Sequence, residues 1–153
     1  MKQCRGRVRT PALGTLKSIV KNLQKPLAVV TVTFSPGRYL SDFLESLRLA
    51  TSLPALTVLA DNGSTDGVPE AAAREHADVE FLDTGGNLGY GAGMNAGARF
   101  ARAKGVDEEF FLIANPDVTF IEGSLDELIA CARRHPDAAA VGPRIVEPDG
   151  SNY

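Results

Sequence analysis

The stretch LAVVTVTF at residues 27–34 decides the fold class, because it is a short apolar run rich in β-branched residues. Such a run is typical of a strand buried on both faces, as in a parallel sheet. Residues 35–50 then show helical spacing of apolar side chains, with Ser35 as the predicted N-cap and Pro36 at the first helical position. We therefore predict a strand over 27–34 and a helix that ends near Ala50.

The same alternation continues along the chain. Four further strands are predicted from apolar runs between turn residues, at 56–60, 79–82, 110–114 and 138–142. Three further helices are predicted to start near residues 69, 93 and 124. Strands that alternate with helices form right-handed βαβ units, which predicts an α/β fold with a mostly parallel sheet and helices on both faces.

Polar residues follow four of the predicted strands. These polar clusters lie at 33–35, 61–66, 85–93 and 115–117. In parallel sheets, ligands bind beyond the carboxyl ends of the strands. The sequence therefore predicts one site, formed by four loops at one edge of the sheet.

Charge divides the 153 residues into two regions with a net charge of −3. Residues 1–25 carry seven Lys and Arg and no acid, whereas residues 26–153 carry all 19 acids and nine bases. An acidic body argues against a nucleic-acid surface, and no apolar run approaches the roughly 20 residues of a membrane-spanning helix. Two distant cysteines favour a reducing compartment, so we expect a cytoplasmic protein.

The basic arm, residues 1–25, allows two interpretations. Leu13, Leu16, Val20 and Leu23 recur at helical spacing, with lysines on a neighbouring stripe. This pattern suits a short helix on an anionic membrane surface. So short a helix is marginal in water, and a solvated tail explains the arm equally well.

The glycine-rich loop at 85–93 opens a predicted helix and could present backbone N–H groups to a phosphate. It lacks the third glycine of G-x-G-x-x-G and the G-K-[ST] ending of a P-loop, which disfavours both of those nucleotide sites. Taken alone, the loop fits a flexible turn that packs a helix against a strand better than it fits a phosphate site.

Carboxylates in two loops suggest binding roles. Asp61 follows a buried strand, where it could accept a hydrogen bond from a ribose or from a pyrimidine N–H; the alternatives are an Asx turn for Asp61 and a helix N-cap for Asp66. Asp117 lies in an Asn-Pro-Asp turn after a strand, a position suited to Mg²⁺ or Mn²⁺. The alternative there is a turn stabilised by hydrogen bonds of Asp117 itself.

Four motifs in order carry a family resemblance: the strand ending at Thr33, DNGSTD at 61–66, NLGYGAGMNAG at 87–97 and FLIANPDV at 111–118. Together they resemble the nucleotide-sugar half of family 2 glycosyltransferases, which have the GT-A fold. The subgroup most similar to them contains bacterial rhamnosyltransferases of cell-wall and O-antigen assembly. The resemblance covers about residues 27–150.

The resemblance implies a role for specific side chains. Thr33 and Asp61 would face the nucleoside, and residues 87–95 would line the diphosphate and sugar. The implied donor-binding residues are Thr33, Asp61, Asn87, Gly89, Asn95 and Asn115. Asn115 replaces the first acid of the family's Asp-x-Asp motif, which leaves Asp117 as the charged ligand for Mg²⁺ or Mn²⁺.

The activity implied by the resemblance is inverting transfer of a sugar, with L-rhamnose from dTDP-rhamnose as the favoured donor and a UDP-sugar as the other. The acceptor would be lipid-linked or polysaccharide, at the inner face of the cell membrane. Family members carry the acceptor site and catalytic base in a later half, and no residue here matches that base. Residues 26–153 are therefore expected to form a donor-binding domain; the alternative is a non-catalytic nucleotide-sugar-binding module.

Overall fold

Strands and helices alternate along the chain in the computed structural model, which describes residues 27–106, 110–147 and 150–151. The strands found there are β1 (Leu27–Thr33), β2 (Ala55–Asp61), β3 (Val79–Asp83) and β4 (Phe111–Ile113). The helices found there are α2 (Tyr39–Ala50), α3 (Val68–Glu75), α4 (Tyr90–Ala103) and α5 (Ser124–Arg134). The predicted α/β alternation is confirmed.

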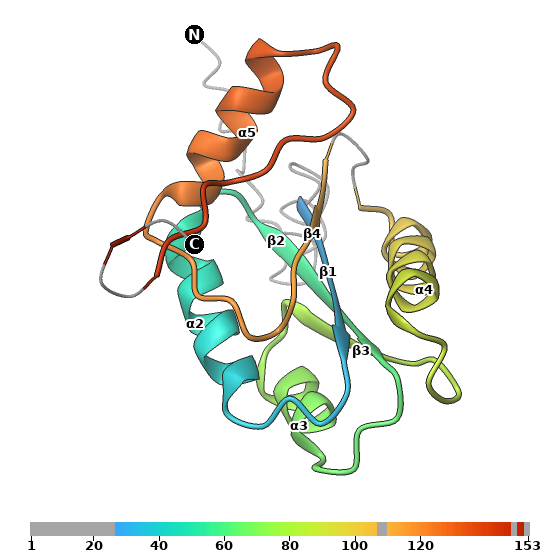
Figure 1. Cartoon of the computed structure of the whole chain (residues 1–153). Helices are drawn as coiled ribbons and strands as arrows, with labels where there is room; N and C mark the ends of the chain where they lie inside the picture. Colours follow the sequence, from blue (N-terminus) through green and yellow to red (C-terminus); the bar gives the residue numbers. More distant parts are fainter. Residues whose placement is uncertain (1–26, 107–109, 148–149, 152–153) are drawn as a thin grey trace, which may run out of the picture.

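The four strands form one parallel sheet in the order β3-β2-β1-β4 (Figure 1). β1 and β2 pair over their whole length, so that Thr33 lies opposite Asp61 at the carboxyl end. Asp61 in turn lies opposite Asp83 of β3. This register brings the starts of three predicted polar loops together at one edge of the sheet.

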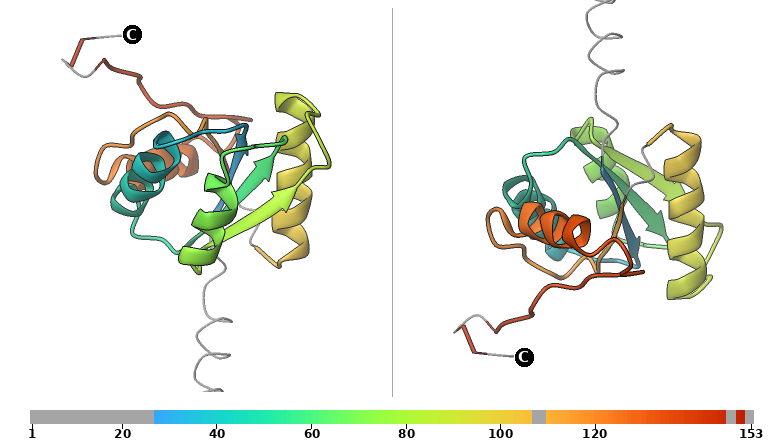
Figure 2. Two further views of the ribbon diagram at one scale, coloured as in Figure 1. Left: turned by 90° about the horizontal axis from the view of Figure 1, so that it is seen from below. Right: turned by 90° about the horizontal axis from the view of Figure 1, so that it is seen from above.

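Helices cover both faces of the sheet, as Figure 2 shows. α2, α3 and α5 pack on one face around a core that includes Val29, Phe43 and Leu59. α4 packs on the opposite face, where Ala101 joins a cluster with Ala28 and Val58. Because side chains alternate between the faces of a strand, β1 needs apolar residues at nearly every position.

Two glycines allow α4 to lie close to β1. A Cβ atom at Gly97 would stand 2.4 Å from Cγ1 of Val30, and one at Gly93 would stand 2.8 Å from Cγ2 of Val32. Both distances are shorter than real carbon atoms adopt, so neither position has room for a side chain. The close packing fixes the start of α4 against the carboxyl end of the sheet.

The start of α2 differs from the prediction. The helix begins at Tyr39 with Arg38 as its N-cap, and Ser35 caps nothing. Ser35 instead has a φ of 49°, and its hydroxyl accepts a hydrogen bond from the N–H of Thr65 at 3.0 Å. Ser35 therefore bonds to the loop after β2 and does not cap α2.

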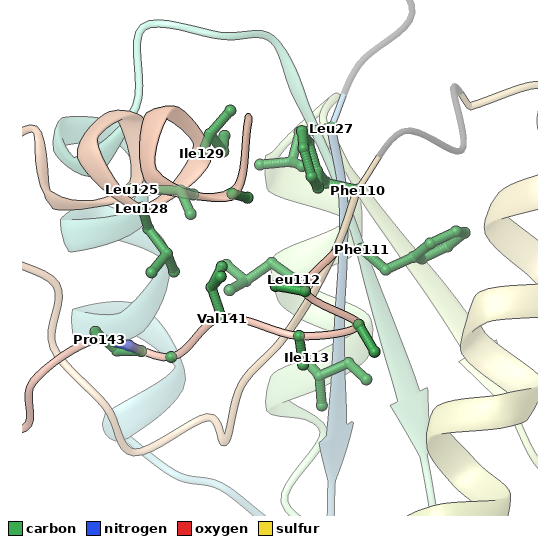
Figure 3. Close-up of a pocket in the computed structure, with 15 residues that line it drawn as sticks. Leu27, Phe110, Phe111, Leu112, Ile113, Leu125, Leu128, Ile129, Val141 and Pro143 are labelled. Carbon is green, nitrogen blue, oxygen red and sulfur yellow. The ribbon is translucent and has the colours of Figure 1, made fainter. Parts of the chain in front are cut away.

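The strand predicted over 138–142 is wrong, since these residues do not pair with the described sheet. Most of them are alanine, which has low β-propensity and buries little surface, and Pro143 cannot donate a ladder hydrogen bond. The segment passes beside β4 instead and, together with α5, encloses a cavity of about 540 Å³ (Figure 3). Apolar side chains line this cavity, among them Leu112 and Leu128.

The basic arm predicted over residues 1–25 lies outside the described residues. Within the part of the chain that is described, none of the helices is both long and apolar enough to cross a bilayer.

Candidate functional site

The loops after the four strands lie at the carboxyl edge of the sheet, toward the lower side of Figure 1. This is the edge where the sequence predicted a site. The cavity beside β4 is a different feature, because its lining offers no polar side chain to a phosphate or a sugar. A polar ligand is therefore expected to bind at the four loops and not in this cavity.

Thr33 and Asp61 form the most buried polar pair at this edge. The Thr33 hydroxyl donates to Oδ1 of Asp61 at 2.6 Å, and Asp61 is only 3% exposed. The Ser64 hydroxyl also donates to Oδ1, while the N–H groups of Gly63 and Ser64 donate to Oδ2 at 3.1 and 2.8 Å. Both predicted nucleoside residues are thus brought together.

These hydrogen bonds favour the ionised form of Asp61. Burial opposes the ionised form, but the bonds from Ser64, Thr33 and Gly63 outweigh it and lower the pKa of the carboxyl below 3.8. Two carboxylate oxygens accept about four hydrogen bonds in all, so the protein already fills the capacity of Asp61. A ligand that bonds to Asp61 must replace one of these donors, and the hydroxyl protons of Thr33 and Ser64 can turn away without any movement of the backbone.

Asn62 links the loop after β2 to the glycine-rich loop. Its side chain is 3% exposed; the Nδ2 group donates to the carbonyl oxygen of Gly89 at 3.2 Å and lies 3.5 Å from Oδ1 of Asn87. Its Oδ1 lies 3.0 Å from the Thr84 hydroxyl. Asn62 therefore holds both sides of the glycine-rich loop against the end of β2.

The glycine-rich loop enters α4 through Gly89. Gly89 has φ 79° and ψ 169°, a conformation that is essentially restricted to glycine. Oδ1 of Asn87 accepts a hydrogen bond from the Gly89 N–H at 2.9 Å and so stabilises this turn. The exposed loop leads directly to the helix N-terminus, where a negative charge is favoured.

The remaining predicted residues are exposed. Asn95 lies on α4, and Asn115 and Asp117 lie in the loop after β4. None of these three side chains hydrogen-bonds to another described residue. Burial and the nearby charge of Asp117 raise the pKa of the Tyr90 hydroxyl, which places Asp117 near the start of α4. The β4 loop therefore brings the Asp117 carboxylate to the same side of the site as Tyr90 and the glycine-rich loop.

The sequence profile of the family described as "Glycosyl transferase family 2" matches residues 28–153. This chain belongs to glycosyl transferase family 2. A relative from Mycobacterium tuberculosis (strain CDC 1551 / Oshkosh), an N-acetylglucosaminyl-diphospho-decaprenol L-rhamnosyltransferase, is 48% identical over 134 residues. The match covers 83% of this chain and 43% of the relative, so the chain spans less than half the relative's length.

Two solved structures share the fold of this chain. S. aureus TarS 1–349 in complex with UDP-GlcNAc gives a TM-score of 0.57 at 18% identity, over 80% of this chain and 38% of TarS. The mannosyltransferase PcManGT from Pyrobaculum calidifontis, in complex with GDP-Man and Mn²⁺, gives 0.58 at 17% identity, over 89% of this chain and 42% of PcManGT. The family 2 chain has the GT-A fold, as its motifs predicted.

Residues of the β4 loop could hold a divalent cation only together with a ligand. Among the described residues, no three His, Cys, Asp or Glu side chains come together to hold a metal ion. Mg²⁺ usually takes one or two carboxylates and completes its shell with water and phosphate oxygens. The exposed carboxylate of Asp117, with the amide oxygen of Asn115 in the same turn, matches that kind of site.

Four residues of the site were given no binding role from the sequence: Ser35, Asn62, Ser64 and Thr84. They act through hydrogen bonds between loops about 20 to 30 residues apart, which no local pattern reveals. The density of hydroxyl and amide residues in the DNGSTD motif was the available signal.

Proposed function

We propose that the chain binds the nucleoside diphosphate sugar of a glycosyltransferase, with dTDP-rhamnose as the donor. The 48% identity with a relative named as an L-rhamnosyltransferase supports rhamnose over other sugars. The structural observation that carries the proposal is the convergence of Thr33, Asp61 and the Asn62-held glycine-rich loop at one edge.

The nucleoside would lie against the loops after β1 and β2. Asp61 is ionised, so it would accept the N–H of a pyrimidine or a ribose hydroxyl once the Ser64 hydroxyl proton turns away, while Ser64 Oγ keeps its bond from the Ser35 N–H. Phe34 directly follows Thr33 and is 63% exposed, which leaves an aromatic ring available to stack on the base. A hydrogen-bond acceptor and a stacking surface are the two features that recognise a pyrimidine.

The diphosphate would lie against the start of α4 and the β4 loop. The backbone N–H groups of the helix N-terminus favour negative charge, and Asp117 would bind Mg²⁺ or Mn²⁺ together with the phosphate oxygens. When bound, the cation neutralises the charge that develops on the leaving nucleoside diphosphate. Asn87, Asn95 and Asn115 offer amide groups to the sugar hydroxyls.

The transfer itself would invert the anomeric centre. An acceptor hydroxyl attacks the anomeric carbon from the face opposite the diphosphate, loses its proton to a general base, and releases dTDP. The relative's name contains a diphospho-decaprenol acceptor, which supports a lipid-linked acceptor for this chain. No described residue is assigned as the base.

A lipid-linked acceptor also supports a place at the cytoplasmic face of the membrane. The seven bases of the arm would add electrostatic attraction to anionic lipids.

Titration calorimetry with dTDP, UDP and GDP, each with and without Mn²⁺, tests donor binding. We expect dTDP and UDP to bind and GDP to bind more weakly, because the guanine ring is larger and presents different hydrogen-bonding groups. Equal affinity for all three would contradict a pyrimidine site. A second assay measures release of dTDP from dTDP-rhamnose in the presence of a GlcNAc-diphospho-prenol. Binding without release would favour the non-catalytic module.

A further inference from the structure

Ser35 is held in a conformation that serine rarely adopts. Its φ of 49° is the only positive φ outside glycine in the described part of the chain. A left-handed serine costs energy relative to an extended or helical one, so the surrounding structure must hold it there. Such strain calls for an account of what the residue does.

Hydrogen bonds to the loop after β2 hold Ser35 in place. Its N–H donates to Oγ of Ser64 at 2.8 Å, and its Oγ accepts from the N–H of Thr65 at 3.0 Å. Two residues later, the N–H of Gly37 donates to Oδ2 of Asp66 at 2.9 Å. These three hydrogen bonds join the loops after β1 and β2, and the Ser35 hydroxyl accepts one of them.

The hydrogen bonds of its two neighbours restrain the backbone of Phe34. Its neighbour on one side, Thr33, is bonded to Asp61, and its neighbour on the other side, Ser35, is bonded to Ser64 and Thr65. The backbone of Phe34 is thus fixed at both ends, although its ring is mostly exposed. These hydrogen bonds therefore fix the backbone from which the exposed Phe34 ring projects, one residue after the Thr33 that is bonded to Asp61.

We propose that Ser35 is a positioning residue: its hydrogen bonds hold the backbone at Phe34, so that the base of a pyrimidine nucleoside diphosphate stacks on the Phe34 ring without a rearrangement of the loop. This inference rests on the proposed function and adds to it the residue that prepares the stacking surface. Ser35 itself need not contact the nucleotide.

The test is a double-mutant cycle read by dTDP and UDP affinity in the full chain. Ser35→Ala removes the hydroxyl bond to Thr65, and we expect it to weaken both nucleotides by about tenfold. Ser35→Gly keeps the left-handed backbone without strain but also lacks the hydroxyl, so it provides a well-folded second variant with the same expected loss. Ser35→Asn tolerates a positive φ and offers a side-chain oxygen to Thr65, so it should restore most of the affinity.

The decisive comparison is in a Phe34→Ala background. If Ser35 acts through the ring, Ser35→Ala costs no further affinity there, whereas a general loss of structure would add to the effect of Phe34→Ala. Additive losses overturn the inference, as does parental affinity in both Ser35→Ala and Ser35→Gly. A parent chain that binds neither dTDP nor UDP overturns the proposed function and this inference with it; a binding parent with additive variants overturns this inference alone.

Discussion

The loops at the two sides of the carboxyl edge are built differently. On the β1–β2–β3 side, polar side chains join one loop to the next: Thr33 to Asp61, Ser35 to Thr65, and Asn62 to the glycine-rich loop. On the β4 side, the Asn115 and Asp117 side chains hydrogen-bond to no other described residue. The first side is organised before a ligand arrives, and the second leaves its oxygen ligands free for one.

Packing follows the same division. β1 and β2 are central in the sheet and pair over seven residues, whereas β4 pairs over three and has an apolar cavity on its outer side (Figure 3). The loops after β1 and β2 begin at the ends of long central strands, whose positions are fixed by the sheet. A loop that follows a short edge strand is less constrained, which suits a ligand-dependent cation site. We therefore expect substitutions on the β1–β2–β3 side to lower the free energy of unfolding. Substitutions on the β4 side should lower only the affinity for the ligand.

Asp61→Asn should have the largest effect. The amide has one acceptor oxygen in place of two, so at least one of the buried donors now bonded to Asp61 loses its partner. We expect a loss of about 2–3 kcal/mol in the free energy of unfolding, measured by urea denaturation, and a loss of dTDP affinity. If the variant has the same free energy of unfolding as the parent, the hydrogen bonds between the β1–β2–β3 loops do not stabilise the fold, and the contrast with the β4 loop fails.

Gly97→Ala should have the next largest effect, because it separates α4 from the sheet. The new Cβ would meet Val30, and overpacking outweighs the better helix propensity of alanine by about 1–2 kcal/mol. Gly91→Ala is the matched control: it lies in the same helix with no atom within 4 Å of the added Cβ, so it should stabilise by about 0.5 kcal/mol. Thermal unfolding of both variants separates packing from propensity, and equal shifts would contradict the close approach.

Low pH should remove the contribution of the Asp61 carboxylate to the free energy of unfolding. Because the folded-state pKa of Asp61 is lowered from 3.8, its ionised form stabilises the fold above that pH, and this stabilisation is lost as the pH falls through the folded-state value. The stability difference between the parent and Asp61→Asn should therefore be constant above about pH 5 and shrink below about pH 4. The other carboxyls titrate in both proteins, so the difference isolates Asp61. An unchanged difference at pH 3 would show that the carboxylate charge contributes nothing.

The sequence predicts those features whose signal is local. The apolar run at 27–34 and the helical spacing before Ala50 gave β1 and the body of α2, and the order of polar loops gave the site edge. Ser35 carried a local N-cap signal that lost to a hydrogen bond with Thr65, 30 residues away. Bonds of that kind depend on the register between strands, which is set by the whole sheet. The alanine-rich 138–142 run failed for another reason: it is apolar, but it has too little bulk to hold a strand in place.

Asp117→Asn should leave stability unchanged and affect only metal-dependent binding. The side chain is exposed and hydrogen-bonds to no other described residue, so the fold does not depend on its charge. Mn²⁺ should raise the dTDP affinity of the parent and not that of the variant, while affinity without metal stays similar in both. Calorimetry with and without Mn²⁺ measures this, with Asp66→Asn as a control acid from the hydrogen-bonded side. A parent that binds dTDP equally well without metal would place diphosphate binding on the helix N-terminus alone.

Removing the basic arm should have the smallest effect on the donor site, because Leu27 begins β1 at the edge of the sheet opposite the four loops (Figure 1). A chain that starts at Pro26 should bind dTDP as the full chain does. Its membrane binding should differ: seven bases without an acid contribute about 1 kcal/mol each near an anionic surface, which together supports weak, reversible attachment. Flotation with anionic and neutral vesicles compares the two chains, and salt should release the full chain because exposed charges are screened beyond roughly 8–10 Å. Equal flotation of both chains would make the arm a solvated tail. A loss of dTDP affinity in the shortened chain would show instead that the arm contributes to the donor site. The site would then consist of the β1–β2–β3 loops, the β4 loop and the arm.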